Sequence, residues 1–520
     1  MYLKTINKFI CILLVILMFL TATSCGDDED QSVSYQTQSS ISTMDPQLCK
    51  ESAELTAAAN CFEGLMRIDE NGKVTNGFAK SYNISKDGLT YTFKLRNDGL
   101  WSDKETKVTA DDFVFGITRA LLPETKSPFA ALLYSIKNAE DVNAGKKSSS
   151  QLGVKATDDE TVVITLEKLD HNLLYALANP VAFPCNREFF NSTKGKYGLD
   201  RKNTLTNGSF YIKSWSTDTS LMRFSRFDEF SGTPATLSYF SIGYNRESAV
   251  ISDNVINEYI SMGSIPPENL ETAKKSGSNG YSFYNITYCL YIDPDFAKEN
   301  PHIAKALLCN IDKSTIDINL PIYLQSAKGI VSPSALERDE NFRDTAGDLA
   351  MPDYNVDKAS KLLDDNKNSR NKLSGVDLYY PDNQDFKLIA SVMAQTWQKD
   401  LNAYINIKPV SETKINTNLK DYTLAIVPIK SNDNTAYGTM INLTDYGVSG
   451  LSSLISGSVT ADKTTAISKL KQAEQKLIDA NILYPLVYSS ECYAAIPDVS
   501  GLIFSRSGSF IDFRKTKVDD

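Results

Sequence analysis

The sequence predicts an α/β protein with mixed sheets and more than one domain. Segments with the apolar spacing of amphipathic helices alternate along the chain with segments that have the two-residue period of strands. The chain has 520 residues, whereas a single hydrophobic core rarely exceeds about 250–300 residues. No internal repeat with a fixed period is visible, so no repeat architecture is indicated.

The first 24 residues have the composition of a secretion signal. Lys4 and Lys8 precede an unbroken run of 12 apolar residues, Phe9–Leu20. As a helix this run would be about 18 Å long, which is too short for the ~30 Å hydrocarbon core of a membrane. We therefore expect residues 1–24 to be a signal peptide rather than a membrane span.

Cys25 directly follows the small residues 21–24. A thiol in this position can be alkylated by a diacylglycerol and become the new N-terminus, and the segment resembles a bacterial lipobox, with Ala22 where leucine is commonest. An ordinary signal peptide with a chance cysteine is the alternative. Residues 25–30 read as the lipidated cysteine and an acidic tether. We expect an extracytoplasmic body that is held at the cell membrane by this lipid only.

The composition disfavours several classes of function. Residues 1–24 contain two lysines and no acids, so 52 basic and 64 acidic side chains remain after their removal, a net charge of −12. No basic patch indicates nucleic-acid binding. The chain has two histidines, His171 and His302, and no Cys-x-x-Cys pair, so we expect no metal site and no cofactor. The spacing of the six cysteines after Cys25 dictates no disulfide.

Two strands and a helix are predicted before residue 170. Residues 89–96 alternate apolar and polar side chains, and residues 161–167 form a second strand after two turn-forming aspartates. Between them, Thr109 is an N-cap followed by acids in the first helical turn, and apolar residues continue to Leu121. This pattern predicts a helix of about three turns.

The same alternation continues in the C-terminal half. Apolar residues recur at helical spacing from Leu388 to Trp397, and strands are predicted around residues 405–407 and 424–427. A long amphipathic helix over residues 467–478 precedes a buried strand over residues 484–488. Helices and strands therefore alternate to the end of the chain, as mixed α/β sheets require.

From Phe62-Glu63-Gly64-Leu65 onward the chain resembles the peptide-binding subunits of ABC importers, the extracellular solute-binding proteins of family 5. The motifs that carry this resemblance are Gly77–Tyr82, Tyr91–Arg96, Leu100–Asp103, Val108–Val114, Thr206–Phe210, Pro301–Lys313 and Ile496–Gly501. Residues 127–156 resemble the oligopeptide branch in particular. Most of these motifs are structural: Trp101 and Phe113 are expected in the core, and Asn207-Gly208 predicts a turn that tolerates a positive φ.

The resemblance implies a two-lobed fold like that of periplasmic binding proteins (class II, cluster C), with an inserted extra domain. The lobes close over a ligand by a hinge motion. Mapped onto this sequence, domain I comprises residues 31–57, 184–282 and 490–520. The inserted domain II comprises residues 58–183, and domain III, the opposing lobe, comprises residues 283–489.

The resemblance also implies where the ligand lies. In relatives an extended ligand pairs its backbone with short strands of both lobes, and the matching segments here are Ser39-Ser40-Ile41-Ser42 and Val427-Pro428-Ile429-Lys430. Pro428 departs from the pattern because it has no N–H to donate. Phe129 stands where relatives offer an aromatic ring to the ligand.

Relatives hold the amino terminus of the ligand with the aspartate of a Trp-x-x-Asp stretch. Here the stretch has no tryptophan, Asn432 is nearest to the place of the aspartate, and Asp433 is one residue away. On an extended segment a one-residue offset would point the side chain to the opposite face, although a loop could correct it. Asp433 is therefore either the ammonium partner or a solvated loop acid.

Several functions fit this sequence. The resemblance implies a monomer that binds oligopeptides and delivers them to the permease subunits of an ABC transporter. A peptide-sensing surface receptor or chaperone, and a binding protein for a non-peptide solute, are the alternatives. A surface hydrolase is disfavoured because the chain lacks Gly-x-Ser-x-Gly and has two histidine bases at most, so we expect no enzyme activity.

Overall fold

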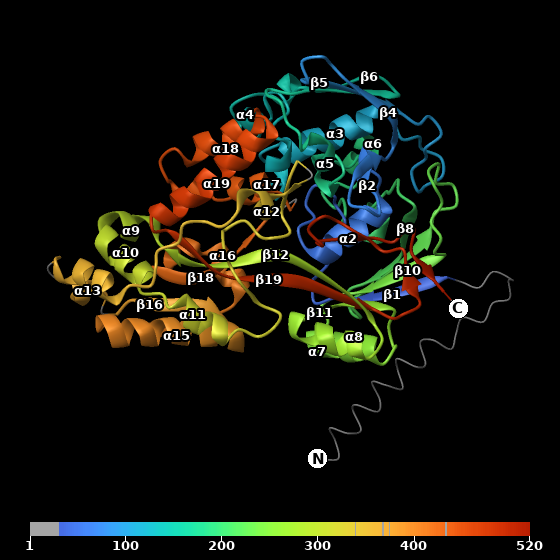
Figure 1. The fold of residues 1–520 in the computed structure, drawn as a ribbon. Coiled ribbons are helices and arrows are strands. Elements are labelled where there is room, and N and C mark those ends of the chain that lie inside the picture. The colour runs from blue at the N-terminus through green and yellow to red at the C-terminus, as the bar shows by residue number, and fades with distance from the viewer. Residues whose placement is uncertain (1–30, 339, 367–368, 374, 432–433, 520) are drawn as a thin grey trace.

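The computed structural model describes residues 31–338, 340–366, 369–373, 375–431 and 434–519 (Figure 1). Its central feature is an 11-stranded sheet that combines parallel and antiparallel pairs. In spatial order the strands are β17 (Asn406–Val410), β16 (Asp377–Pro381), β18 (Leu424–Lys430), β12 (Asn279–Ile292), β19 (Leu483–Ala495), β11 (Met262–Ile265), β1 (Ser32–Gln36), β10 (Tyr239–Gly243), β9 (Leu221–Arg226) and β8 (Phe210–Ser216), with β13 (Gln325–Ser326) paired to β19.

Two long strands, β12 and β19, pass through the middle of this sheet (Figure 1). They pair antiparallel from Asn279 opposite Ala495 to Tyr291 opposite Leu483. The register shifts between Phe283 and Ile286 on β12, which leaves two residues of β12 opposite one residue of β19. The pair is therefore bulged near its middle.

The chain builds a separate hydrophobic core on each side of this bulge. The first core draws its buried residues from 33–262 and from 493–513, the two ends of the described chain. The second core is built from buried residues between 286 and 487. The chain leaves the first core along β12 and returns to it along β19.

A second, antiparallel sheet belongs to the first core. Its order is β4 (Ala79–Ile84), β5 (Thr90–Leu95), β7 (Thr161–Thr165) and β6 (Val154–Asp158). Helix α3 (Ala110–Leu121) packs on β6 and β7, and it begins with a capping box between Thr109 and Asp112. The strands predicted at 89–96 and 161–167 and the helix predicted from Thr109 are confirmed, and Trp101 and Phe113 are fully buried as expected.

The C-terminal predictions are also confirmed. The helices are α15 (Gln384–Leu401) and α19 (Lys463–Asp479), and β17 and β18 cover the two predicted strands. The strand predicted at 484–488 is longer than expected, because β19 continues to Ala495 as it crosses from the second core to the first. α17 (Ala436–Ile441) and α18 (Leu451–Val459) pack with α19.

Shorter elements complete the fold. The remaining α-helices are α2 (Ser52–Cys61), α4 (Ala139–Asn143), α5 (Leu173–Ala176), α6 (Arg187–Ser192), α7 (Ser248–Ile256), α8 (Leu270–Lys275), α9 (Pro294–Glu299), α10 (Pro301–Cys309), α11 (Lys313–Ile318), α12 (Phe342–Ala346), α13 (Val356–Asp364), α14 (Ser369–Leu373) and α16 (Glu412–Thr417). The two-stranded pairs are β2 (Met66–Ile68) with β3 (Val74–Asn76), β14 (Leu336–Glu337) with β15 (Glu340–Asn341), β20 (Val499–Ser500) with β23 (Lys517–Val518), and β21 (Ile503–Phe504) with β22 (Ile511–Asp512). Within the described ranges, none of the helices has the length and apolar character needed to cross a bilayer.

The role predicted for Asn207-Gly208 is wrong. Neither residue has a positive φ. Gly208 is instead needed for close packing, because a Cβ added there would lie 2.5 Å from the carbonyl carbon of Cys61. The side chain of Asn207 forms two hydrogen bonds with the backbone of Glu63. Oδ1 accepts from the N–H, and Nδ2 donates to the carbonyl oxygen, each at 3.1 Å. The pair therefore docks the 207–208 segment against the end of α2 rather than forming a left-handed turn.

Candidate ligand-binding site

The segment predicted to pair with a ligand, Ser39–Ser42, is irregular chain that follows β1. The backbone N–H groups at its two ends already form hydrogen bonds. Ser39 N–H donates to Thr37 Oγ1 at 3.2 Å, and Ser42 N–H donates to Glu54 Oε1 at 2.9 Å. The backbone groups of Ser40 and Ile41 have no hydrogen-bond partner in the described part of the chain. The unpaired backbone is therefore shorter than the predicted four residues.

Glu54 fixes the shape of this loop. Its buried carboxylate accepts the N–H and hydroxyl of Ser42 through Oε1, and the N–H groups of Lys50 and Glu51 through Oε2. These bonds tie the loop to the N-terminal turn of α2, where a negative charge is favoured by the helix dipole. The chain that follows Ser40 and Ile41 is therefore fixed to α2.

The second predicted segment is the end of β18. This strand pairs with β12 along its whole length, from Ile292 opposite Leu424 to Ile286 opposite Lys430. On its other side β16 pairs only with Leu424 and Ala425, so residues 426–430 have no second strand partner among the described residues. Pro428 lies within this stretch, which has only β12 as its partner, and it has no N–H to donate.

Glu491 lies near the end of β18 and acts electrostatically on Tyr35 of β1. Lys430 Nζ lies 3.6 Å from Glu491 Oε1, and Asn285 Nδ2 donates to Glu491 Oε2 at 3.2 Å. On the β1 side, burial raises the pKa of the Tyr35 hydroxyl to about 12, and the negative charge of Glu491 adds to this rise. A carboxylate is therefore present where β1, β12, β18 and β19 come together.

Phe129 lies in a different part of the first core. It precedes the short 3-10 helix at Ala130–Leu133, and its half-buried ring packs on first-core residues. Among the described residues, no backbone hydrogen bond of Phe129 reaches Ser39–Ser42 or β18. Asn432 and Asp433 lie outside the described residues.

Asn434 links the two cores. Its side chain is 2% exposed, and its Nδ2 donates to the carbonyl oxygens of Ser334 at 2.9 Å and Arg506 at 2.8 Å. Arg506 belongs to the C-terminal segment of the first core, and its guanidinium lies 3.4 Å from the centre of the Tyr175 ring. Asn434 has a φ of 54°, a left-handed conformation that asparagine tolerates better than most residues.

Replacing Asn434 with glycine is expected to loosen the contact between the cores. Glycine accepts the same φ but removes both hydrogen bonds that Nδ2 donates. Together these contribute about 1–3 kcal/mol to stability. Small-angle scattering of the ligand-free protein should give a larger radius of gyration. The matched control is Asn481→Gly, at a φ of 58°, where no side-chain hydrogen bond is found in the described structure. Identical scattering from both variants would contradict the proposed link.

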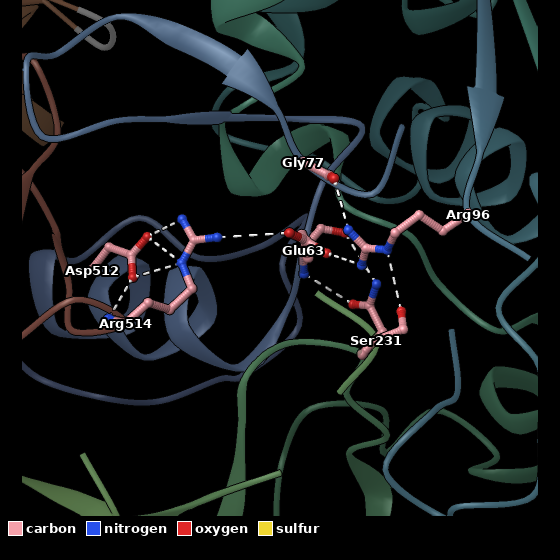
Figure 2. Close-up of polar contacts among 7 residues, drawn as sticks. Glu63, Gly77, Arg96, Ser231, Asp512 and Arg514 are labelled. Carbon is pink, nitrogen blue, oxygen red and sulfur yellow. Dashed lines mark hydrogen bonds and ion pairs between the residues drawn. The ribbon is translucent and has the colours of Figure 1, made fainter. Parts of the chain in front are cut away.

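Two cavities adjoin the first core, and neither is lined by a predicted ligand residue. One, of about 20 Å³, lies among residues 59–68, 178–183 and 503–514. The other, of about 90 Å³, lies among residues 67–70, 233–236 and 503–515. They flank a network of buried charges in which Glu63 lies between Arg96 and Arg514, while Arg514 also pairs with Asp512 (Figure 2).

Comparison with known proteins identifies the family. A family model described as bacterial extracellular solute-binding proteins, family 5 Middle, matches residues 73–449, which is more than half of the chain. The chain belongs to this family.

Curated relatives and solved structures agree with this assignment. The dipeptide-binding protein of Lactococcus lactis subsp. cremoris is 32% identical over 197 residues, which are 38% of this chain and 36% of that protein. The periplasmic oligopeptide-binding protein OppA of Salmonella typhimurium is 26% identical over 497 residues, which are 89% of this chain and 88% of that protein. The substrate-binding domain of an oligopeptide ABC transporter from Bacillus anthracis str. Ames has a TM-score of 0.78 at 23% identity, covering 95% of this chain and 99% of that chain. The predicted resemblance and its two-lobed α/β fold are confirmed.

The sequence of this solute-binding protein did not single out two residues that lie in or beside the candidate site. Glu491 is the single charged residue in the 13-residue strand β19, and that isolation is a signal that could have found it. Asn434 has no such signal, because its bonds to Ser334 and Arg506 span 100 and 72 residues.

Proposed function

We propose that this protein binds a peptide or peptide-like ligand between its lobes and delivers it to the permease subunits of an ABC importer. Family membership supports the transport role, and the names of the relatives support a peptide ligand. The observation that carries the proposal is a pair of backbone stretches with free hydrogen-bonding groups. These are Ser40-Ile41 and the edge of residues 426–430 that faces away from β12, contributed from opposite sides of the bulged strands. The closing bodies are domains I and II (31–57, 184–282, 490–520; 58–183) and domain III (283–489).

The ligand is held mainly through its backbone. An extended peptide forms N–H···O=C bonds with Ser40-Ile41 on one side and with β18 on the other, which gives affinity without reading side chains. Pro428 reduces the donors that β18 offers. Phe129 adds an aromatic contact from domain II. Asn432 or Asp433, following β18, is the place for the ammonium group.

Acetylating the ligand amine is expected to weaken binding by less than about 10-fold. A charge-assisted bond to an enclosed ammonium is worth about 1.5–3 kcal/mol, or roughly 10- to 100-fold in affinity, and the aspartate expected near Asn432 is missing. Calorimetry measures the ratio of the affinities for the free and the N-acetylated peptide. The measurement is made with the native protein, with Asp433→Asn and with Glu491→Gln.

The two variants separate the explanations. If acetylation abolishes native binding and Asp433→Asn weakens the free peptide by the same factor, Asp433 holds the amine and the relaxed recognition is wrong. If only Glu491→Gln reproduces the loss, the acid on β19 holds it. If neither peptide binds, the ligand is not a peptide, and mass spectrometry of the co-purified ligand then identifies its class.

We also propose that Cys25 carries the lipid and that the body acts as a monomer outside the cytoplasm. In cell fractionation, Cys25→Ala is expected to move the protein from the membrane to the soluble fraction, because alanine has no thiol to carry the lipid. Ser24→Ala is the matched control, since it keeps both the cysteine and a small residue before it. Membrane-bound, lipid-modified Cys25→Ala protein would refute the anchor.

A further inference from the structure

The C-terminal segment of the first core contains a hairpin whose turn contacts the second core. Its strands, β21 and β22, pair antiparallel through residues 503–504 and 511–512. Between them, Ser505 N–H donates to Phe510 O and Gly508 N–H donates to Ser505 O, each at 2.9 Å. We call residues 505–509 the C-terminal turn.

The C-terminal turn is cross-linked by its own hydroxyl groups and lies against β12. Ser507 Oγ donates to Ser509 Oγ at 2.6 Å, and Ser505 Oγ lies within 3.2 Å of both. Gly508 has a φ of 73°, and a Cβ added there would lie 2.5 Å from the ring of Phe283. This close approach places the turn directly beside the bulge in β12, which follows Phe283.

Three consecutive carbonyl oxygens of the turn, those of residues 506–508, accept hydrogen bonds from three parts of the molecule. The donors are, in order, the amide of Asn434 at 2.8 Å, the amide of Asn285, and the hydroxyl of Tyr493 at 2.6 Å. Asn434 packs with the second core, Asn285 lies in the bulge, and Tyr493 lies on β19 in the first core. The turn therefore joins both cores and the strands that connect them.

The side chain of Arg506 fixes the turn to the predicted domain II. Its Nε donates to Gly72 O at 3.1 Å, and its Nη2 donates to the hydroxyl of Tyr175. The guanidinium also lies 3.4 Å from the centre of the Tyr175 ring. The residue whose carbonyl oxygen binds Asn434 is thus positioned by the lobe that faces domain III.

The bulge is bonded to the same network. The hydroxyl of Ser334 donates to Tyr284 O at 2.7 Å, and Asn434 Nδ2 donates to Ser334 O at 2.9 Å. Asn285 Nδ2 donates to Glu491 Oε2 at 3.2 Å as well as to the turn. A hinge motion at the bulge that moves domain III away would pull Asn434 off the carbonyl oxygen of Arg506.

We propose that the C-terminal turn is the latch of the closed form, with Arg506 as its positioning residue. Opening breaks the bond from Asn434, while the bonds from Tyr493 and to Tyr175 keep the turn on the first core. The latch shifts the balance between open and closed molecules, and so regulates access to the site between the lobes. It rests on the proposed function in that the site lies between these lobes.

The test is the distance between spin labels on the ligand-free full chain, measured in detergent by pulsed electron paramagnetic resonance. The labels are attached to Lys146→Cys in domain II and Ser453→Cys on α18, two exposed positions, whereas the six described cysteines are buried. Arg506→Met is expected to raise the ratio of open to closed molecules about 2- to 10-fold, the range of one hydrogen bond. Arg187→Met is the matched control, because its guanidinium also lies on a ring, 4.1 Å from the centre of Phe115, but both residues belong to the same lobe. It should leave the ratio unchanged.

A double variant separates the latch from a general loosening. In the Asn434→Gly background Arg506→Met should add nothing, because the bond that Arg506 positions is already gone. Independent addition of the two effects, or an unchanged ratio in Arg506→Met, would overturn the latch. If Arg506→Met does not fold, Tyr175→Phe decides, since it keeps the ring and removes the hydroxyl that Arg506 binds; it should raise the ratio less, and no rise would overturn the latch. Failure of every peptide to bind would refute the proposed function but would not change this ligand-free measurement.

Discussion

Replacing Arg119 with methionine is expected to lower the free energy of unfolding by about 3–5 kcal/mol. Arg119 Nη2 lies 2.6 Å from Asp45 Oδ2, and Nη1 donates to Asp45 Oδ1 at 3.2 Å and to Gln47 Oε1 at 2.7 Å. The side chains of Arg119 and Asp45 are 6% and 2% exposed. The variant leaves the carboxylate of Asp45 buried without a counter-charge, which is the costly outcome.

Denaturant unfolding measures this loss of stability, and a variant in an exposed ion pair serves as the reference. Arg226 Nε lies 2.9 Å from Asp228 Oδ1 at the surface, so Arg226→Gln should change the stability by less than about 1 kcal/mol. The double variant Arg119→Met with Asp45→Asn should regain part of the loss, because the unpaired charge is then gone. Equal effects of Arg119→Met and Arg226→Gln would refute the role of the buried pair.

Replacing Glu63 with glutamine is expected to cost about 3 kcal/mol or more. The carboxylate is 4% exposed and lies 2.6 Å from Arg96 Nη2 and 3.6 Å from Arg514 Nη1 (Figure 2). A neutral amide removes the only acid that Arg96 pairs with among the described residues. It also points an N–H₂ group toward a guanidinium group, so Arg96 loses its counter-charge and Arg514 keeps only Asp512.

Glu70→Gln is the matched control for this variant. Glu70 also pairs with the C-terminal segment, through Lys515 at 2.7 Å, but both side chains are 52% exposed. Its loss should be small and should vanish in high salt, which screens exposed charges. The loss in Glu63→Gln should persist in high salt, and a loss that salt removes would contradict its burial between the two arginines.

The elements could be predicted from the sequence because their signals are local. The alternation in residues 89–96 and the capping box from Thr109 to Asp112 depend on neighbours within four residues, and both appear as expected. The extra length of β19 was not visible, because its last residues pair with β11 and β12, which lie more than 200 residues earlier. Tertiary pairing, and no local pattern, decides where that strand ends.

The candidate site was less predictable for the same reason. The sequence pointed to Ser39–Ser42, but Ser42 is bound by Glu54 of α2 and the carbonyl oxygen of Ser39 accepts from Asn245 N–H. Only the structure therefore shows that the backbone groups of the middle two residues have no partner among the described residues. Glu63 stands in a motif that identified the family, yet its two arginine partners lie 33 residues later and near the far end of the chain. Gly208 was misread because its role is a close approach to Cys61 rather than a local turn.

The proposed closure of the lobes would bend the sheet at the bulge in the β12 and β19 pair. Tyr284 and Asn285 stand opposite a single residue of β19, so the ladder is already interrupted where the chain passes from one core to the other. The same pair has a second register shift between Tyr288 and Cys289, and the sheet is continuous on both sides of both irregularities. We expect a joint made of continuous strands to bend rather than to swivel freely. Such bending would bring the Ser40-Ile41 backbone and the free edge of β18 toward each other along a reproducible path.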